Sequence, residues 1–198
     1  MGFWWGLFAF YTLSASAATP HKDVCGNLLR QCSVDGVISG PARSASPLTR
    51  AQVKRVMGAV RATFVFLRNN PDVLPREWAE ANHASRVPSR GFCFVAANAV
   101  YHLLGGKAAG LTPMFAKYDD EEMGEGASHW WLRDLDGAYL DPTADQYTAY
   151  GKFPPYENGK GAGFNRPLHV PTKAGALIME QAKKILRRAG YRSNGLPN

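Results

Sequence analysis

The feature that most constrains the fold is a β-hairpin signal in the segment 129–141, HWWLRDLDGAYLD. Two runs of strand-forming residues flank the short turn DLDG. Asp134 at the first turn position and Gly137 at the fourth favour a type I turn that ends in a left-handed bulge residue. Such a three-residue loop pairs Asp134 with Ala138. The chain is therefore predicted to contain an antiparallel strand pair whose register follows from its turn.

This register decides which side chains share a face of the hairpin. Trp131 lies opposite Asp141, and His129 is the diagonal neighbour of Asp141 on the same face, about 7 Å away. A loop of two or four residues would place His129 and Asp141 on opposite faces, because side chains alternate along a strand. The sequence therefore predicts a histidine beside a carboxylate, with Trp131 on their face and Trp130 towards the core.

Helices are predicted on either side of the hairpin in the chain, so we expect an α+β fold in which helices cover a small antiparallel sheet. Thr49 and Gln52 form a capping box ahead of apolar residues at helical spacing. The segment 93–104 contains strong helix formers followed by two glycines, so a helix is expected to begin at Cys93. The other predicted elements are a short helix over 75–84, a strand over 111–118, an acidic flexible loop over 119–128, irregular chain over 150–171 and a last helix over 172–189.

Length and composition predict one domain. The chain has 198 residues, of which 45% are hydrophobic. A domain of this length buries about 70% of the surface of its unfolded chain, so it needs no metal or disulfide framework for stability. Collagen-like, coiled-coil and disordered chains are excluded by the lack of the corresponding repeats and by the apolar fraction. We expect this domain over residues 48–198, after an irregular arm over 18–47 that is rich in Gly, Ser, Pro and Ala.

Residues 1–17 are interpreted as an export signal or as a leader that does not belong to the native protein. An apolar run of thirteen residues, too short for a membrane-spanning helix, precedes a small-x-small pattern typical of cleavage sites. No Lys or Arg comes before this run, which leaves a cytoplasmic protein with a misassigned start as the alternative. Export to the periplasm or the cell exterior would let Cys25 and Cys32 pair in an oxidising compartment. In both cases Cys93 is the odd thiol, and no stable membrane span is expected.

Cys93, His129 and Asp141 together indicate thiol chemistry. Thiol catalysis needs a thiolate, a base that holds its proton and a third group that orients the base. A helix N-terminus stabilises a thiolate through its dipole, and its first N–H groups can face an oxyanion on an attacked carbonyl. The carboxylate on the neighbouring strand can accept the imidazole N–H that does not face the sulfur. Each residue alone is more often structural, so the prediction rests on their combination.

These residues resemble the transglutaminase-like branch of the papain-like cysteine enzymes. The resemblance covers residues 90–146, with a Cys that opens a helix, a strand with His-Trp and a strand that ends in Asp-Pro-Thr. It implies a papain-like or transglutaminase-like core in which the helix with Cys93 packs on a small antiparallel sheet. It also implies Cys93 as the nucleophile, His129 as the general base and Asp141 as the orienting acid. The likeness is closest to small uncharacterised members of that branch, some of them phage-borne.

A narrower motif lies directly before the cysteine. Arg90-Gly91-Phe92-Cys93 is similar to the R-G-G-x-C of arylamine N-acetyltransferases, although Phe92 stands where that motif has Gly. The expected reaction is thiol-dependent attack on an amide, ester or thioester through an acyl-enzyme at Cys93, with hydrolysis and acyl transfer both open. We expect a peptide, protein or small acyl substrate, flanked by Trp131, Phe92 and Arg90. No cofactor is expected, and a zinc ion held by the three catalytic candidates is a weaker alternative because no C-x-x-C or H-E-x-x-H accompanies them.

A second class of function starts from charge. The net charge is +7, and residues 172–198 contain six basic residues against one acidic residue. A basic C-terminal helix of this kind could serve a non-enzymatic module that binds nucleic acid or an anionic surface. We expect an amphipathic helix with a solvated basic face instead, because no nucleic-acid motif or aromatic platform accompanies it.

Overall fold

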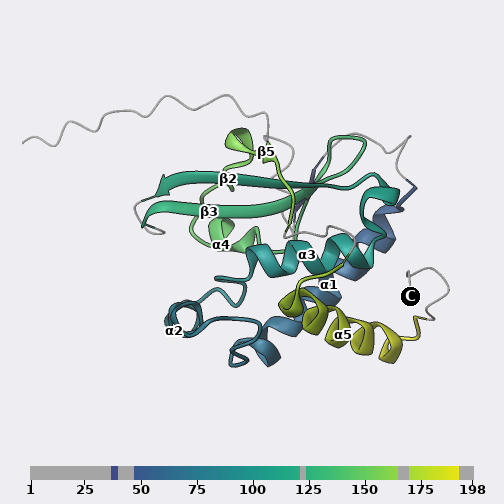
Figure 1. The fold of residues 1–198 in the computed structure, drawn as a ribbon, viewed down its shortest axis with the longest axis horizontal. Coiled ribbons are helices and arrows are strands. Elements are labelled where there is room, and N and C mark those ends of the chain that lie inside the picture. The colour runs from purple at the N-terminus through teal and green to yellow at the C-terminus, as the bar shows by residue number, and fades with distance from the viewer. Residues whose placement is uncertain (1–36, 40–46, 121–123, 165–169, 192–198) are drawn as a thin grey trace, which may run out of the picture.

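The protein consists of two layers in a computed structural model that describes residues 37–39, 47–120, 124–164 and 170–191. One layer is a sheet of the strands β1 (Val37–Ser39), β2 (Thr112–Asp120), β3 (Gly124–Arg133), β4 (Tyr139–Asp141) and β5 (Lys160–Gly161). The other contains the helices α1 (Arg50–Leu67), α3 (Cys93–Leu103) and α5 (Lys173–Arg188), which lie along one side of the sheet in Figure 1. The connections contain α2 (Arg76–Ala84), α4 (Asp145–Thr148) and the 3-10 turns η1 (Gly106–Ala109) and η2 (Tyr156–Asn158). The coarse prediction of an α+β fold with a small antiparallel sheet is confirmed.

The strand order in the sheet is β1-β4-β3-β2-β5, and each neighbouring pair is antiparallel. The hairpin of β3 and β4 has the predicted register. Leu132 pairs with Leu140, and the Asp134 N–H donates to the Ala138 carbonyl over 3.0 Å. Gly137 has a φ of 79°, as the left-handed bulge position requires. The turn prediction is confirmed, and it places the odd-numbered residues of both strands on one face.

The predicted helices are present, with ends shifted by only a few residues. The Thr49 hydroxyl accepts from the Gln52 N–H over 3.1 Å, and the Gln52 side chain accepts from the Thr49 N–H over 2.9 Å. The expected capping box therefore opens α1. Helix α3 begins at Cys93, as predicted, and Gly105 with a φ of 93° follows its end.

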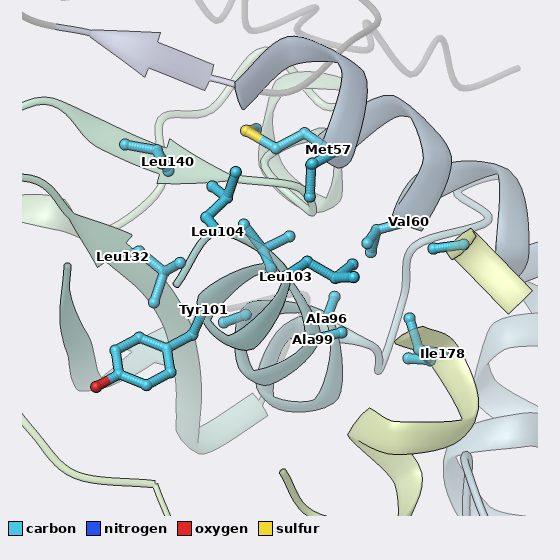
Figure 2. Close-up of a cluster of buried hydrophobic side chains, with 14 of the residues drawn as sticks. Met57, Val60, Ala96, Ala99, Tyr101, Leu103, Leu104, Leu132, Leu140 and Ile178 are labelled. Carbon is cyan, nitrogen blue, oxygen red and sulfur yellow. The ribbon is translucent and has the colours of Figure 1, made fainter. Parts of the chain in front are cut away.

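One large apolar core joins the helical layer to the sheet (Figure 2). Leu132 of β3 and Leu140 of β4 lie towards Leu103 of α3, and α1 and α5 contribute Met57 and Ile178. Each of these five side chains is exposed by 1% or less. Burial on this scale fixes α3 against the sheet, so the first residue of α3 has a defined position relative to β3.

The acidic segment after β2 differs from the prediction. We expected a flexible loop over 119–128, but β2 continues to Asp120 and β3 begins at Gly124. The loop prediction is wrong because backbone pairing between the two strands extends outward from His129. The Asp119 carboxylate also accepts the Gly126 N–H over 2.8 Å, which ties one of the predicted loop carboxylates to the opposite strand.

Two segments predicted to be irregular contain short strands. Strand β1 lies within the predicted arm over 18–47 and pairs with β4, and β5 lies within 150–171 and pairs with β2 at Met114 and Phe115. Helix α4, directly after the Asp-Pro-Thr segment, was not predicted either. Elements of two to four residues carry almost no local signal, because their order depends on pairing and packing with the rest of the fold.

The N-terminal predictions lie outside the described residues. These predictions are the export signal or leader over 1–17 and the pairing of Cys25 with Cys32. Within the described part of the chain, no helix has the length and apolarity needed to cross a membrane. Cys93 is a free thiol in that part.

Candidate active site

His129 and Asp141 form a buried pair across the β3–β4 hairpin. The Nε2 atom of His129 lies 2.6 Å from Oδ2 of Asp141, and neither side chain is exposed to solvent. The histidine lies within β3, and the carboxylate belongs to the last residue of β4. The hairpin register therefore brings the two side chains into direct contact, and the carboxylate can hold the imidazole ring in one orientation.

The Asp141 carboxylate accepts four hydrogen bonds. Oδ1 accepts from the Thr143 N–H over 2.8 Å and from the Thr143 hydroxyl over 2.9 Å. Oδ2 accepts from the Tyr156 hydroxyl over 3.0 Å in addition to His129. A carboxylate has about four lone-pair sites, so these donors use its whole hydrogen-bonding capacity. The buried negative charge is thereby stabilised, and its orientation is fixed.

The two members of the pair shift each other's ionisation. Burial raises the pKa of Asp141, but the charge and hydrogen bond of His129 and the two hydrogen bonds from Thr143 outweigh it and lower that pKa. Burial lowers the pKa of His129, yet the charge and hydrogen bond of Asp141, with smaller contributions from Cys93, raise it from 6.5 to about 9. An ion pair of carboxylate and imidazolium therefore dominates at neutral pH.

Cys93 lies beside this pair at the start of α3. Its side chain is half-buried, and its Sγ is 3.9 Å from the Ser128 carbonyl oxygen on β3. The thiol is also close enough to His129 to raise the pKa of the imidazole. Because Nε2 is bound to Asp141, Nδ1 is the nitrogen available to the thiol, and it is fully buried without a conventional hydrogen bond in the described part of the chain. The structure thus brings together the three residues predicted from the sequence.

The helix start also presents backbone donors. The Ala96 N–H donates to the Phe92 carbonyl over 2.8 Å and closes the first turn of α3. The N–H groups of the three residues before Ala96, which begin with Cys93, therefore precede the first intrahelical hydrogen bond. Such groups at a helix N-terminus favour negative charge, as on a thiolate or on the oxyanion of an attacked carbonyl.

The loop before Cys93 is held by the amide of a buried asparagine. Asn82, in α2, donates through Nδ2 to the carbonyls of Pro88 and Arg90, over 2.8 Å in each case. Gly91 follows with a φ of 83°. These contacts fix the backbone on the N-terminal side of the nucleophile candidate, so its position does not depend on α3 alone.

An ion pair between α1 and α4 also binds the same loop, through Ser89. Arg61 of α1 donates through both terminal nitrogens to the Asp145 carboxylate, over 3.1 Å each, and to the Pro142 carbonyl over 2.7 Å. The Ser89 hydroxyl donates to the same carboxylate over 2.5 Å, and the Gln146 side chain donates to the Ser89 carbonyl over 2.7 Å. This network connects the loop before Cys93 with the chain that follows Asp141.

Tyr147 packs against the imidazole, and a second tyrosine binds the hydroxyl of Tyr147. The ring of Tyr147, from α4, meets the His129 ring edge-on with 4.7 Å between centroids. Its hydroxyl is hydrogen-bonded to that of Tyr118 on β2. Burial raises the pKa of Tyr147, and the hydrogen bond to Tyr118 and the charges of Cys93 and Asp141 act in the same direction. Tyr147 therefore stays a neutral phenol and shields the pair from water.

Two of the residues expected to flank a substrate are not exposed. Trp131 lies on the predicted face, stacked on His129 with 5.7 Å between centroids, but it is 0% exposed. Phe92 is also 0% exposed and stacks on Phe64 in the core. Both rings fill apolar space and present no surface to solvent, and their contact with a substrate stays a prediction. Arg90 is half-buried, and its backbone carbonyl is bound by α2.

Sequence reasoning missed several residues that hold the site. Thr143 could have been found, because a polar side chain two residues after an aspartate commonly closes a local turn. Tyr147, Tyr156 and Asn82 had no such signal, since each reaches the site through tertiary packing. Trp78 was also missed. Its side chain is 45% exposed and packs against Gly91, two residues before the nucleophile candidate.

The alternative predictions have less structural basis. In the described part of the chain, no group of three or more His, Cys, Asp and Glu side chains is arranged to hold a metal ion. On α5, two of the basic side chains are paired with acids: Lys173 with Asp72 and Lys184 with Glu180, over 2.7 Å each. The opposite face of α5 is buried against α1 and α3.

Comparisons of the chain with models of protein families, with curated proteins and with solved structures found no match in any of the three. The resemblance of residues 90–146 to the transglutaminase-like branch therefore stays a prediction from their sequence motif.

Proposed function

We propose that the protein is a cysteine hydrolase or acyltransferase with a papain-like, transglutaminase-like core, and that Cys93, His129 and Asp141 form its catalytic triad. One observation carries this proposal. A single buried imidazole binds a carboxylate through Nε2 over 2.6 Å and leaves Nδ1 for a thiol at a helix N-terminus. A nucleophile, a base and an orienting group in contact form the arrangement on which covalent acyl transfer depends.

In the acylation step, the reacting state has the Cys93 proton already on Nδ1 of His129, so that a thiolate lies beside the imidazolium. The thiolate forms a bond to the carbonyl carbon of an amide, ester or thioester. The carbonyl π electrons move to oxygen, where the first N–H groups of α3 can stabilise the negative charge. When the tetrahedral intermediate collapses, the bond to the leaving group breaks. The Nδ1 proton passes to that leaving group, and a thioester on Cys93 remains.

In the deacylation step, water or an amine attacks the thioester. The neutral imidazole takes a proton from the attacking group, and the carbon–sulfur bond then breaks to leave the Cys93 thiolate beside the imidazolium. The products are an acid or an amide, with the enzyme restored. A peptide, a protein or a small acyl compound can enter this scheme, and no cofactor takes part in it.

Stoichiometric acylation tests the proposal. A p-nitrophenyl ester should release a burst of p-nitrophenol equal to the protein concentration, and peptide mass spectrometry should locate the acyl group on Cys93. Cys93→Ala should eliminate the burst, and His129→Ala should slow it strongly. His83→Ala is the matched control, because His83 is exposed and its ring is bonded to the Asn69 side chain, away from Cys93 in the sequence and on another helix. Failure of Cys93 to accept an acyl group from esters, thioesters and amides, or an acyl group on another residue, would overturn the proposal.

A further inference from the structure

Tyr156 donates to the same carboxylate oxygen that binds the histidine. Its hydroxyl lies 3.0 Å from Oδ2 of Asp141, and the Nε2 atom of His129 lies 2.6 Å from that oxygen. Tyr156 belongs to η2, in the connection between α4 and β5, fifteen residues after Asp141 in the chain. The contact is therefore supplied by tertiary structure and not by the hairpin that pairs the other two residues.

The hydroxyl of Tyr156 completes the hydrogen bonding of Asp141. Thr143 binds Oδ1 through two donors, which prevents the carboxylate from turning about its own axis. On Oδ2, one donor is the imidazole and the other is the phenol. Without the phenol, one lone-pair site of a buried carboxylate lacks a donor, and water or a rotated imidazole has room to take it.

Packing holds the Tyr156 ring in place independently of its hydroxyl. The ring lies 4.5 Å from that of Tyr139 and 5.2 Å from that of Trp131, between centroids. Close approach of the turn to the indole depends on Gly159, where a Cβ atom would lie 2.3 Å from Cζ2 of Trp131. The turn is thus anchored by rings and by a glycine, so removal of the hydroxyl alone leaves the turn in position.

We propose that Tyr156 is a positioning residue of the triad: it fixes Oδ2 of Asp141 so that the Nε2–H of His129 stays on the carboxylate and Nδ1 stays towards Cys93. This inference rests on the proposed function for its effect on turnover. Its structural part concerns the His129–Asp141 bond and can be measured without any substrate.

Tyr156→Phe tests the inference, with Tyr139→Phe as the matched control. Both changes remove one hydroxyl from the same pair of contacting rings, and in the described part of the chain it is the Tyr156 hydroxyl that binds Asp141. Tyr156→Phe should slow acylation of Cys93 by a p-nitrophenyl ester about tenfold, because a hydrogen bond to a charged group is lost. In proton NMR, the low-field Nε2–H resonance of His129 should exchange with solvent faster in Tyr156→Phe. Tyr139→Phe should match the wild type in both measurements.

The two readouts separate the inference from the proposed function. If the wild type forms no acyl-enzyme, the proposed function fails, and the exchange rate of the Nε2–H still decides whether Tyr156 positions Asp141. If the wild type is acylated and Tyr156→Phe equals Tyr139→Phe in acylation rate and in exchange rate, the inference is wrong. A loss of acylation with an unchanged exchange rate would also overturn it, because the effect would then not pass through the His129–Asp141 bond.

Discussion

At the residue scale, the two oxygens of Asp141 have different neighbours. Oδ1 faces the two donors of Thr143, and Oδ2 faces His129 and the Tyr156 hydroxyl. A carboxylate accepts on both sides, whereas an amide of the same shape has one acceptor and one donor side. An aspartate at position 141 therefore favours a proton on Nε2 of His129. An asparagine there can instead donate to an Nε2 that carries no proton.

Asp141→Asn should keep the fold and lower acyl transfer by up to about 10⁴-fold, the loss seen for the corresponding change in a serine triad. With its oxygen towards Thr143, the Asn amide donates to Nε2 of His129 and forces the proton onto Nδ1, which then cannot accept the Cys93 proton. The measurement is turnover per folded molecule, with the folded fraction from circular dichroism. Asp72→Asn, a change to a surface residue that pairs with Lys173, is the control. Near wild-type turnover in Asp141→Asn would show that the carboxylate is only structural.

The stability of the fold should depend on pH through His129. The pKa of this residue is about 9 in the folded state against 6.5 in an unfolded chain. Its stabilising contribution is therefore complete below pH 6.5 and is lost as the pH rises to about 9, and the difference corresponds to about 3 kcal/mol. The lowered pKa of Asp141 adds an opposite loss in acid, as the pH falls below 3.8 towards the folded-state value.

Urea unfolding between pH 6 and pH 10 measures this contribution. The free energy of unfolding of the wild type should fall more steeply with pH than that of His129→Gln, because the variant lacks the titrating group. Subtraction of the two curves removes the titration of lysines, tyrosines and the thiol. Parallel curves over this range would contradict a raised pKa for His129.

The sequence predicted the chemical groups of the site better than their surroundings. Cys93, His129 and Asp141 were found because a helix start and a hairpin turn are local signals that also set side-chain direction. Trp131 and Phe92 were predicted to flank a substrate because an aromatic residue near a nucleophile can line a substrate site. The same residue type can equally pack in the apolar core. The local sequence pattern does not distinguish these two roles, because the exposure of a side chain depends on which other helices and strands pack over it.

At the scale of elements, α1, α4 and the loop before α3 meet at one carboxylate. Asp145 binds Arg61 through both oxygens and the Ser89 hydroxyl through one of them. Arginine presents two parallel N–H groups to such a carboxylate, whereas lysine offers a single ammonium group. A lysine at position 61 would therefore keep the positive charge but would lose the two parallel hydrogen bonds to Asp145.

Arg61→Lys should lower the free energy of unfolding by about 2 kcal/mol, because a partly buried pair loses its second hydrogen bond and its contact with Pro142. It should also slow acylation of Cys93, since the loop through Ser89 is less firmly held. Arg76→Lys is the matched control, because the Arg76–Glu80 pair is exposed on α2 and far less stabilising. Equal effects of the two changes on melting and on acylation would contradict a positioning role for the network.

Element prediction succeeded where the signal was local and failed where order comes from pairing. The capping box at Thr49 and the turn at Asp134 specify their elements within a few residues. The acidic segment after residue 119 was predicted as a loop from composition, although antiparallel pairing carries both strands through most of it. Strands β1 and β5 have too few residues for periodicity, so only the neighbouring strand determines them.

At the scale of the whole molecule, the site and the main core are different regions. The core lies between the helices and one face of the sheet, through Leu132 and Leu140. The side chains of His129 and Trp131 lie on the opposite face of β3 from Leu132. On that face, Trp131 packs with Met114 and Ala116 in a separate small cluster. Truncation of a side chain in the main core should therefore lower stability without changing the chemistry of the site.

Ile178→Ala tests this separation. Ile178 is fully buried between α5, α1 and α3, and truncation in such a core costs about 2–5 kcal/mol and lowers the melting temperature by about 10 °C in a chain of this size. Turnover per folded molecule at 25 °C should stay close to that of the wild type, because the substitution leaves the hairpin and the start of α3 in place. Val65→Ala, at an apolar residue of α1 that is 57% exposed, should change neither quantity. A large loss of turnover in folded Ile178→Ala would mean that the position of Cys93 depends on the docking of α5 as well as on the contacts of its own loop.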